Sequence, residues 1–278
     1  MTCLGWRTGA LTGRRAAMDA GRPRPYAIAP MGRLEGRAIL VTGASSGIGR
    51  AIARRCASED ANVLATGRNE AHLAELAQEH PSIAVHPADL TEASAADGCA
   101  DAAVGRFGRL DGLVHAAGIV RRGEDIRSTT DDQWAEMRDI NLDATFRLAR
   151  ACLREMVPRR SGSVVLVGSQ LAQVGAPGYA SYCAVKGAVE ALVRALAVDF
   201  GPSGIRVNSL TPGLVQTPLA YVDRPDFDDQ IETIAARLPL RRIGQPDDMA
   251  GPAVFLLSDD SAWMTGQSLV VDGGYTVQ

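Results

Sequence analysis

Short apolar segments alternate with longer amphipathic segments along most of the chain. Seven runs of three to six mostly apolar residues recur after Arg37. Runs of this length that are rich in Val, Ile and Leu are typical of strands buried on both faces. The expected strands are 38–41, 62–66, 83–85, 113–115, 163–167, 205–210 and 268–272.

The segments between these runs carry helical periodicity. The clearest are 50–57, 70–80, 94–107, 131–157 and 184–198, the last being apolar on nearly every side. Strands that alternate with helices of crossover length predict a single doubly wound α/β domain. We therefore expect a parallel seven-stranded sheet with helices on both faces, in one domain that spans residues 35–278.

Residues 1–34 have a different composition from the rest. Six arginines face one acid, Asp19, among Gly, Pro and Ala, without a periodic apolar face. The segment has no apolar run of signal-peptide length, and it contains no serine, which a transit peptide favours. The prediction is a disordered N-terminal extension.

Composition excludes several classes of protein. The 278 residues carry a net charge of −3 with both signs interspersed, so neither nucleic acid nor a membrane surface is expected as a partner. The five cysteines are scattered without a C-x-x-C pair, which indicates a reducing compartment and a cytoplasmic location. The four histidines lack metal-binding spacing, so no metal site is expected.

A glycine-rich turn joins the first strand to the first helix. The segment from Thr42 to Gly49 reads T-G-A-S-S-G-I-G. Gly43 permits a tight turn, Gly47 lets a backbone approach a pyrophosphate, and Gly49 lets the helix pack closely on the strand. Strand, glycine turn and helix in this order predict a dinucleotide site in which phosphate lies at the helix N-terminus.

Tyr182 precedes Lys186 by four residues in a segment expected to be helical, so the two side chains share one face. A free phenol titrates near ~10. An ammonium about 4 Å away, at an effective dielectric near ~20, contributes about 4 kcal/mol, enough to lower that pKa by about two to three units. The pair therefore predicts a general acid or base.

Together these motifs resemble the short-chain dehydrogenase/reductase family from about Leu34 to the C-terminus. The resemblance implies a Rossmann-type fold and hydride transfer between a nicotinamide and a secondary alcohol or ketone. Ser169 follows the fifth strand and precedes Tyr182 by 13 positions, as the family spacing requires. The catalytic residues that it implies are Asn141, Ser169, Tyr182 and Lys186.

The same resemblance implies a cofactor site. Arg68 stands where an acid would accept an adenine-ribose hydroxyl, so NADP(H) is favoured, with NAD(H) as the alternative if Arg68 is merely solvated. Asp89 resembles the family's adenine contact, although it would equally cap the next helix. The expected cofactor-binding residues are Gly43, Ser45, Ser46, Gly47, Ile48, Gly49, Arg68, Asp89, Leu90, Ala116, Ala117, Gly118, Tyr182, Lys186, Pro212, Gly213, Val215 and Thr217.

Three further expectations follow from the resemblance. His115 replaces an asparagine of the family motif, and a structural role is expected for it. Residues 214–242 are expected to form a lid over the substrate, and the helix after Lys186 to meet another subunit in a dimer or tetramer. A small-molecule substrate is expected, and no motif selects one. A non-catalytic sensor or scaffold of the same fold is the alternative function.

Overall fold

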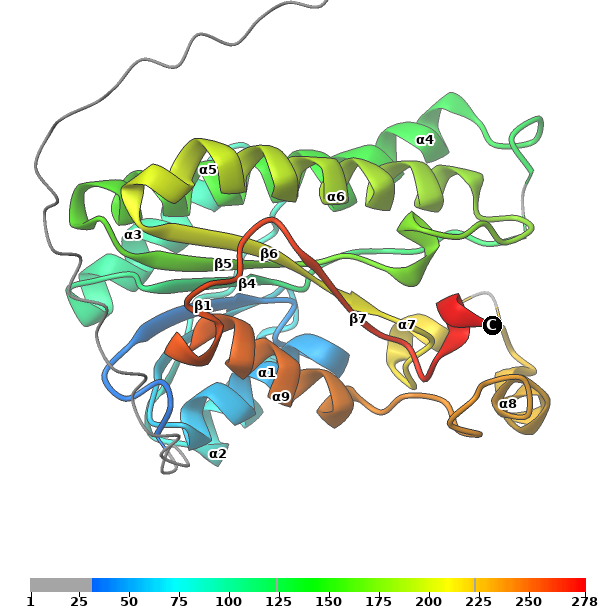
Figure 1. Cartoon of the computed structure of the whole chain (residues 1–278), viewed down its shortest axis with the longest axis horizontal. Coiled ribbons are helices and arrows are strands. Elements are labelled where there is room, and N and C mark those ends of the chain that lie inside the picture. The colour runs from blue at the N-terminus through cyan, green and yellow to red at the C-terminus, as the bar shows by residue number, and fades with distance from the viewer. Residues whose placement is uncertain (1–31, 124, 223) are drawn as a thin grey trace, which may run out of the picture.

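The computed structural model describes residues 32–123, 125–222 and 224–278. One parallel sheet of seven strands runs through this part of the chain, in the order β3-β2-β1-β4-β5-β6-β7 (Figure 1). The predicted fold class is therefore confirmed. The strands are β1 Ala38–Thr42, β2 Asn62–Thr66, β3 Ile83–Val85, β4 Gly112–His115, β5 Gly162–Val167, β6 Ile205–Pro212 and β7 Ser268–Val271.

Each central strand is buried on both faces, as its apolar run predicts. Every residue of β1 and β4 is buried, and β6 is buried at all but one position. Because successive side chains alternate between faces, each strand supplies apolar groups to two separate cores. This double burial fixes the strand register and hence the positions of the residues that follow each strand.

Helices cover both faces of the sheet. Figure 1 shows α3, α5 and α6 on one side and α1, α2 and α9 on the other, as the two apolar cores require. The helices of the two layers are α1 Gly47–Ser58, α2 Glu70–Glu79, α3 Ala95–Phe107, α4 Asp131–Arg138, α5 Ala144–Met156, α6 Ala180–Phe200 and α9 Pro246–Leu257.

The single helix expected over residues 131–157 is interrupted. A π-helical segment, Asp139–Asp143, separates α4 from α5 and contains Asn141. A buried amide competes for backbone hydrogen bonds, and the Asn141 side chain donates to the carbonyl of Met137 at 3.0 Å. The expectation of one uniform helix was wrong at this point, and π segments of this kind often lie at functional sites.

The expected lid segment, 214–242, is more ordered than its sequence pattern indicated. It contains two helices, α7 Pro218–Tyr221 and α8 Phe227–Ala235. A small apolar cluster of its own, centred on the fully buried Phe227, holds the two helices together. Tyr221 packs edge-on against Phe227, with ring centroids 4.9 Å apart. Whether this segment opens and closes stays a prediction.

The folded domain begins earlier than predicted. Residues 1–31 of the expected extension lie outside the described residues, but residues 32–34 pack on the domain. Leu34 is fully buried in the core, and Arg33 forms an ion pair with Glu59 at 2.7 Å. Its hydrogen bonds and those of Arg55 lower the pKa of Glu59 to about 2. Residues 33 and 34, which the prediction assigned to the extension, thus pack on the folded part of the chain.

Two absences apply to the described part of the chain. None of its helices combines the length and the apolar character that a membrane span requires. Within the same residues, no group of three or more His, Cys, Asp or Glu side chains is arranged to hold a metal ion.

We predict that Leu34→Ala lowers the free energy of unfolding by about 2–5 kcal/mol, because it removes a fully buried side chain and leaves a cavity. Urea or thermal unfolding measures the effect. The exposed neighbour Glu35→Ala is the control and changes stability by less than about 0.5 kcal/mol. Equal stability of both variants would contradict the assignment of residue 34 to the core.

Candidate functional site

The site lies at the carboxyl ends of the strands, at the point beside β1 where the strand order reverses. β1 pairs with β2 on one side and with β4 on the other, so the turns that follow these strands meet at one edge. Gly43 has a φ of +67°, and a Cβ there would lie 2.8 Å from the backbone of Ala116 and Ala117. Only glycine allows the turns after β1 and β4 to approach so closely.

The N-terminus of α1 faces this junction with unpaired backbone donors. Ser46 is the N-cap residue, but its side chain makes no capping hydrogen bond, and the first turn holds no acidic side chain. A Cβ at Gly49 would lie 2.4 Å from the carbonyl oxygen of Gly43, so the helix packs against its own turn. The free N–H groups and the helix dipole make this turn suitable for a pyrophosphate.

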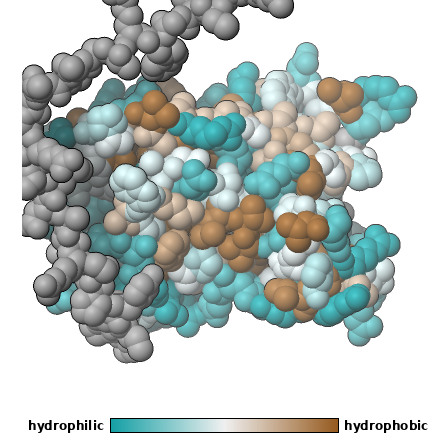
Figure 2. Space-filling view, viewed as in Figure 1, coloured by the Kyte–Doolittle hydropathy of each residue, from teal (hydrophilic) through white to brown (hydrophobic). Residues whose placement is uncertain are grey.

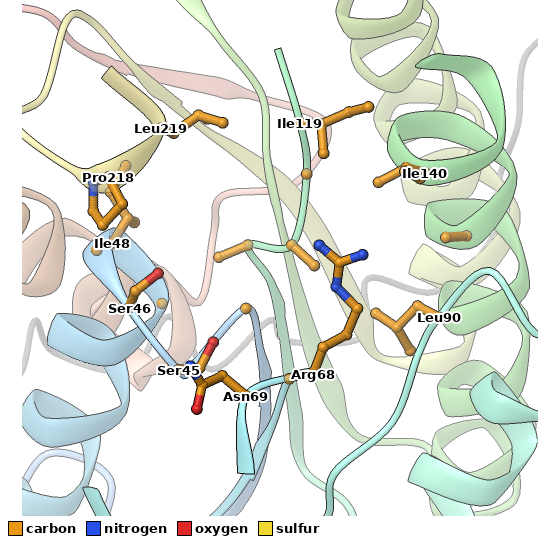
Figure 3. A pocket seen from close by; sticks show the side chains of 18 of the residues that line it. Ser45, Ser46, Ile48, Arg68, Asn69, Leu90, Ile119, Ile140, Pro218 and Leu219 are labelled. Carbon is orange, nitrogen blue, oxygen red and sulfur yellow. The ribbon is translucent and has the colours of Figure 1, made fainter. Parts of the chain in front are cut away.

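The turns after β2 and β3 form the far end of the same cavity. Figure 3 shows the Arg68 side chain directed into the cavity, with Leu90 beside it. A Cβ at Gly67 would lie 3.1 Å from Ser45 Oγ, so the turn after β2 packs closely against the glycine turn here. Asp89 accepts hydrogen bonds from the backbone and hydroxyl of Thr91, and with the Arg68 charge these lower its pKa. The capping residue of α3 is Ser94, not Asp89.

Two adjoining cavities contain every residue that the sequence marked as functional. The first, of about 310 Å³, is lined by the glycine turn, Arg68, Asp89, Leu90, Ala116, Ala117, Gly118 and Thr217. The second, of about 490 Å³, is lined by Asn141, Ser169, Tyr182, Lys186, Pro212, Gly213 and Val215. Both include Ile48, Gly118 and Thr217, so they join, as a dinucleotide site and a neighbouring substrate site must.

Tyr182 does not have the lowered pKa that the Tyr-x-x-x-Lys spacing predicted. Burial raises the pKa of Tyr182 to about 12, and a hydrogen bond with Ser169 and the charge of Arg122 oppose this rise. The Lys186 ammonium lies 5.8 Å from the centroid of the tyrosine ring and donates to the Val167 carbonyl at 2.9 Å. The expectation was wrong because it considered only the attraction between the lysine charge and a phenolate. Desolvation of the buried phenol raises its pKa by more than the nearby positive charges lower it.

Lys186 is itself a buried cation. Burial lowers its pKa to about 8, while the charge of Glu190 raises it. A Cβ at Gly118 would lie 3.8 Å from Lys186 Nζ and 2.8 Å from Asn141 Oδ1, so these three residues form one wall. Asn141 Oδ1 accepts from the Ile119 backbone at 3.2 Å, which orients the amide. The π-helical segment thus holds Asn141 beside the loop after β4.

Glu190 is a functional candidate that the sequence reasoning missed. It is buried one turn beyond Lys186, and its carboxylate accepts hydrogen bonds from Ser209 at 2.7 Å, Thr211 at 2.9 Å and Ser268. Three hydroxyl donors thus satisfy the hydrogen-bonding capacity of this buried carboxylate. The signal was present in the sequence, since Tyr182, Lys186 and Glu190 recur at intervals of four on one helix.

His115 occupies a structural position. Its Nδ1 lies 2.8 Å from Thr42 Oγ1, which ties β4 to β1, while its Nε2 is buried without a partner among the described residues. Burial, reinforced by the Lys186 charge, lowers its pKa to about 3, so the ring is neutral. The side chain lines neither of the two cavities of the site. The contact between Thr42 and His115 thus braces the two central strands against each other.

The substrate end of the second cavity also contains residues that sequence reasoning did not assign. Arg122, Arg224 and Arg237 line it, together with Tyr179. They come from the loop after β4, from the two sides of α8 and from the loop before α6. No sequence motif joins such distant positions, and only the tertiary structure brings them together.

Comparisons with known proteins agree with this geometry. Residues 43–276 match a family model described as "Enoyl-(Acyl carrier protein) reductase". The chain is 36% identical over 252 residues to a D-threitol dehydrogenase from Mycolicibacterium smegmatis, covering 88% of this chain and 95% of the relative. It is 34% identical over 249 residues to 2,5-dichloro-2,5-cyclohexadiene-1,4-diol dehydrogenase from Sphingobium indicum, covering 88% and 98%.

Solved structures share the fold. One designated an NAD(P)-dependent gluconate 5-dehydrogenase from Beutenbergia cavernae, with NADP bound at low occupancy, is 40% identical with a TM-score of 0.82. That match covers 88% of this chain and 98% of the other. A structure named only as a short-chain dehydrogenase/reductase family protein is 34% identical with a TM-score of 0.80, covering 88% and 100%.

Proposed function

The chain belongs to the short-chain dehydrogenase/reductase family and is an NAD(P)-dependent oxidoreductase of CH–OH groups, and we propose that its substrate is a polyhydroxylated secondary alcohol or the matching ketone. The names of its relatives support this substrate class, since they refer to threitol, gluconate and a cyclic diol. The alternative of a non-catalytic sensor has no support, because the relatives are named as dehydrogenases and Ser169, Tyr182 and Lys186 are all present.

The observation that carries the proposal is the position of the Ser169–Tyr182 pair. Both line the second cavity, close to the residues that it shares with the first. Ser169 is buried, and its Oγ accepts from the Leu171 backbone at 3.1 Å, which fixes the hydroxyl at the end of β5. A substrate oxygen between these two side chains would be held by two hydrogen bonds at the mouth of the dinucleotide cavity.

The residues present fit a nicotinamide dinucleotide, which when bound accepts or supplies the hydride. The glycine turn and the α1 N-terminus would hold the pyrophosphate, and Pro212, Gly213, Val215 and Thr217 would border the nicotinamide. Lys186 would hold the ribose hydroxyls. Tyr182 donates its proton to the carbonyl oxygen in reduction and takes the alcohol proton in oxidation, while Ser169 stabilises the charge that develops on this oxygen.

The raised pKa of Tyr182 has a direct consequence for these roles. With a pKa of about 12 the phenol stays protonated throughout the neutral range, which suits proton donation to a ketone. Oxidation requires Tyr182 to accept a proton as the phenolate. Positive charge nearby must therefore stabilise the phenolate form. Lys186, whose ammonium lies 5.8 Å from the ring centroid, and Arg122, whose charge opposes the raised pKa of Tyr182, would supply that charge.

We predict that Tyr182→Phe lowers kcat by about 10³ or more while the affinity for the cofactor is retained. The substitution keeps the ring and removes only the hydroxyl group that carries the transferred proton. Cofactor absorbance with a panel of polyols and ketones measures turnover, and fluorescence titration measures binding. The lid variant Tyr221→Phe is the control and retains turnover. Activity of Tyr182→Phe within tenfold of the wild type would refute the assignment.

We propose NADP(H) as the preferred cofactor. Arg68 enters the adenosine end of the cavity, and residues 67–69, directly after β2, include no acid that could accept a ribose hydroxyl. A guanidinium–phosphate contact is worth roughly 1.5–3 kcal/mol, or about ten- to a hundredfold in affinity.

Arg68→Ala is therefore expected to weaken NADPH by about ten- to a hundredfold and to leave NADH nearly unchanged. The measurement is kcat/KM for both cofactors in both proteins. Arg54→Ala, an exposed arginine on the outer side of α1, serves as the control for loss of charge. If Arg68→Ala reduces kcat/KM for NADH as strongly as for NADPH, the arginine contacts the shared adenosine instead.

Glu190 is expected to set the pH at which Lys186 loses its charge. Its carboxylate raises the pKa of a lysine that burial lowers to about 8, so Glu190→Gln lowers that pKa further. Lys186 then becomes neutral at a lower pH, and the alkaline limb of the kcat/KM profile for ketone reduction shifts toward neutrality. Asp199→Asn, an exposed acid on the same helix, leaves the profile in place. An unshifted profile in Glu190→Gln would disprove this coupling.

We further propose that the chain forms homo-oligomers. Phe146 on α5 is 50% exposed and Val198 on α6 is 77% exposed in the single chain. On another face, Figure 2 shows hydrophobic side chains over the region where Figure 1 places the edge strand β7, whose residues are only partly buried. Apolar surface of this extent on helices and on a sheet edge supports pairing with further copies.

We also propose a cytoplasmic location. Cys56, Cys99 and Cys152 are buried free thiols, and Cys183 is a partly buried one. Burial raises the pKa of the Cys56 thiol to about 12. Unpaired thiols of this kind support a reducing compartment.

A further inference from the structure

The substrate cavity carries positive charge at the end away from the glycine turn. Arg122, Arg224 and Arg237 line it, and no Asp or Glu is found among the described residues that do so. Glu124 and Asp223 lie outside the described residues. None of the three arginines takes part in an ion pair in the described part of the chain. A cavity wall with three cations and no described counterion favours an anionic occupant.

Two of the arginines converge on one neutral acceptor. Arg122 Nε and Arg224 Nη2 each lie 2.9 Å from the Tyr179 hydroxyl oxygen. The two donor nitrogens are therefore within about 6 Å of each other, where like charges repel. The remaining contacts of Arg122 are to the carbonyl oxygens of Leu219, at 3.0 Å, and Val222. The positive charges are thus held in place by neutral groups and are not neutralised.

Unpaired polar atoms lie in the same cavity. Arg224 Nη1 and Gln170 Oε1 are buried and have no hydrogen-bond partner among the described residues. Both residues line the cavity. Buried donors and acceptors are nearly always paired in proteins, so these two atoms are available to a molecule that enters the cavity. A guanidinium donor fits an oxyanion, and an amide oxygen fits a hydroxyl.

The arginines are placed to act on the same molecule as the catalytic tyrosine. Arg122 is close enough to lower the pKa of Tyr182, so its charge reaches the reacting end of the cavity. Arg224 precedes α8 and Arg237 follows it, whereas Arg122 follows β4. An oxyanion bound between them would contact both the lid segment and the loop that follows β4.

We propose that the substrate carries an oxyanion, a carboxylate or a phosphate ester, on a short polyhydroxylated chain, and that Arg122, Arg224 and Arg237 bind it. This inference rests on the proposed function. In the oxidative direction the CH–OH carbon gives its hydride to NAD(P)⁺, the oxygen gives its proton to the phenolate form of Tyr182, and a C=O bond forms. The oxyanion takes no part in the chemistry and serves to position the reacting carbon.

The direct test uses substrates that differ only in charge. Gluconate and glucitol share the six-carbon polyol chain, and a carboxylate in the first replaces a CH₂OH group of the second. We expect kcat/KM for the acid to exceed that for the neutral polyol by about ten- to a hundredfold, mainly through a lower KM. Glucitol 6-phosphate is the third arm, and the better of the two anions identifies the group. A kcat/KM for glucitol equal to or higher than those for both anions would overturn the inference.

Variants distinguish charge recognition from structural support. Arg237→Gln removes an exposed guanidinium that has no side-chain hydrogen bond in the described residues, and it is expected to reduce the ratio of acid to polyol kcat/KM by about tenfold, with partial rescue in Arg237→Lys. Arg224→Gln is expected to reduce the same ratio. Arg106→Gln, an exposed arginine on α3, is the matched control. If both arginine variants lower kcat/KM equally for acid and polyol, the role is structural and the inference fails.

A binding measurement separates this inference from the proposed function. Calorimetric titration of NADP-loaded Tyr182→Phe with gluconate, glucitol 6-phosphate and glucitol reports anion preference without turnover. Tighter binding of an anion than of glucitol supports the inference. If the wild-type enzyme nevertheless oxidises none of the three compounds, the proposed substrate class is wrong. Turnover of neutral polyols together with no preferential binding of either anion would leave the proposed function intact and refute the inference.

Discussion

The contact between the turns after β1 and β4 is the constraint on which the site depends. A methyl group at Gly43 would lie 2.8 Å from the β4 turn, so the two turns pack backbone to backbone. That approach places the α1 N-terminus beside Gly118, and Gly118 in turn lies against Asn141 and Lys186. Each step in this series uses a glycine where a side chain would separate two functional groups. The phosphate end and the reacting end of the site are thereby held at a fixed spacing.

Buried charge is the second organising feature, and strands far from the adenosine end of the site contribute to it. Lys186 is a cation whose surroundings favour its neutral form, and the nearby carboxylate of Glu190 opposes that tendency. The Glu190 carboxylate accepts from hydroxyls on β6 and β7, the two strands farthest from the adenosine end. Strands that supply no residue to the first cavity thus influence the proton chemistry at its mouth.

The sequence predicted the architecture well because strand burial on two faces leaves a simple signal. All seven strands were placed to within two residues, and the glycine turn and the Ser169, Tyr182 and Lys186 positions all line the expected cavities. The failures share one cause, which is that desolvation and tertiary contact have no local pattern. The pKa of Tyr182 depends on burial by distant segments, and the π-helical segment depends on hydrogen bonds of Asn141. The convergence of Arg122 with Arg224 joins positions that are about a hundred residues apart.

The central pairing of the sheet also has a consequence for how the protein folds. β1 and β4 are joined by a hydrogen bond between Ala38 and Asp111, 73 positions apart, which exceeds the separation in any other described strand pair. Closing a loop of this length costs entropy before any contact compensates for it, so the β1–β2 and β2–β3 pairs can form sooner than the β1–β4 pair. The dinucleotide cavity does not exist until β4 docks. The cofactor therefore cannot bind before β1 and β4 have paired, and it stabilises only the chain in which this pairing is complete.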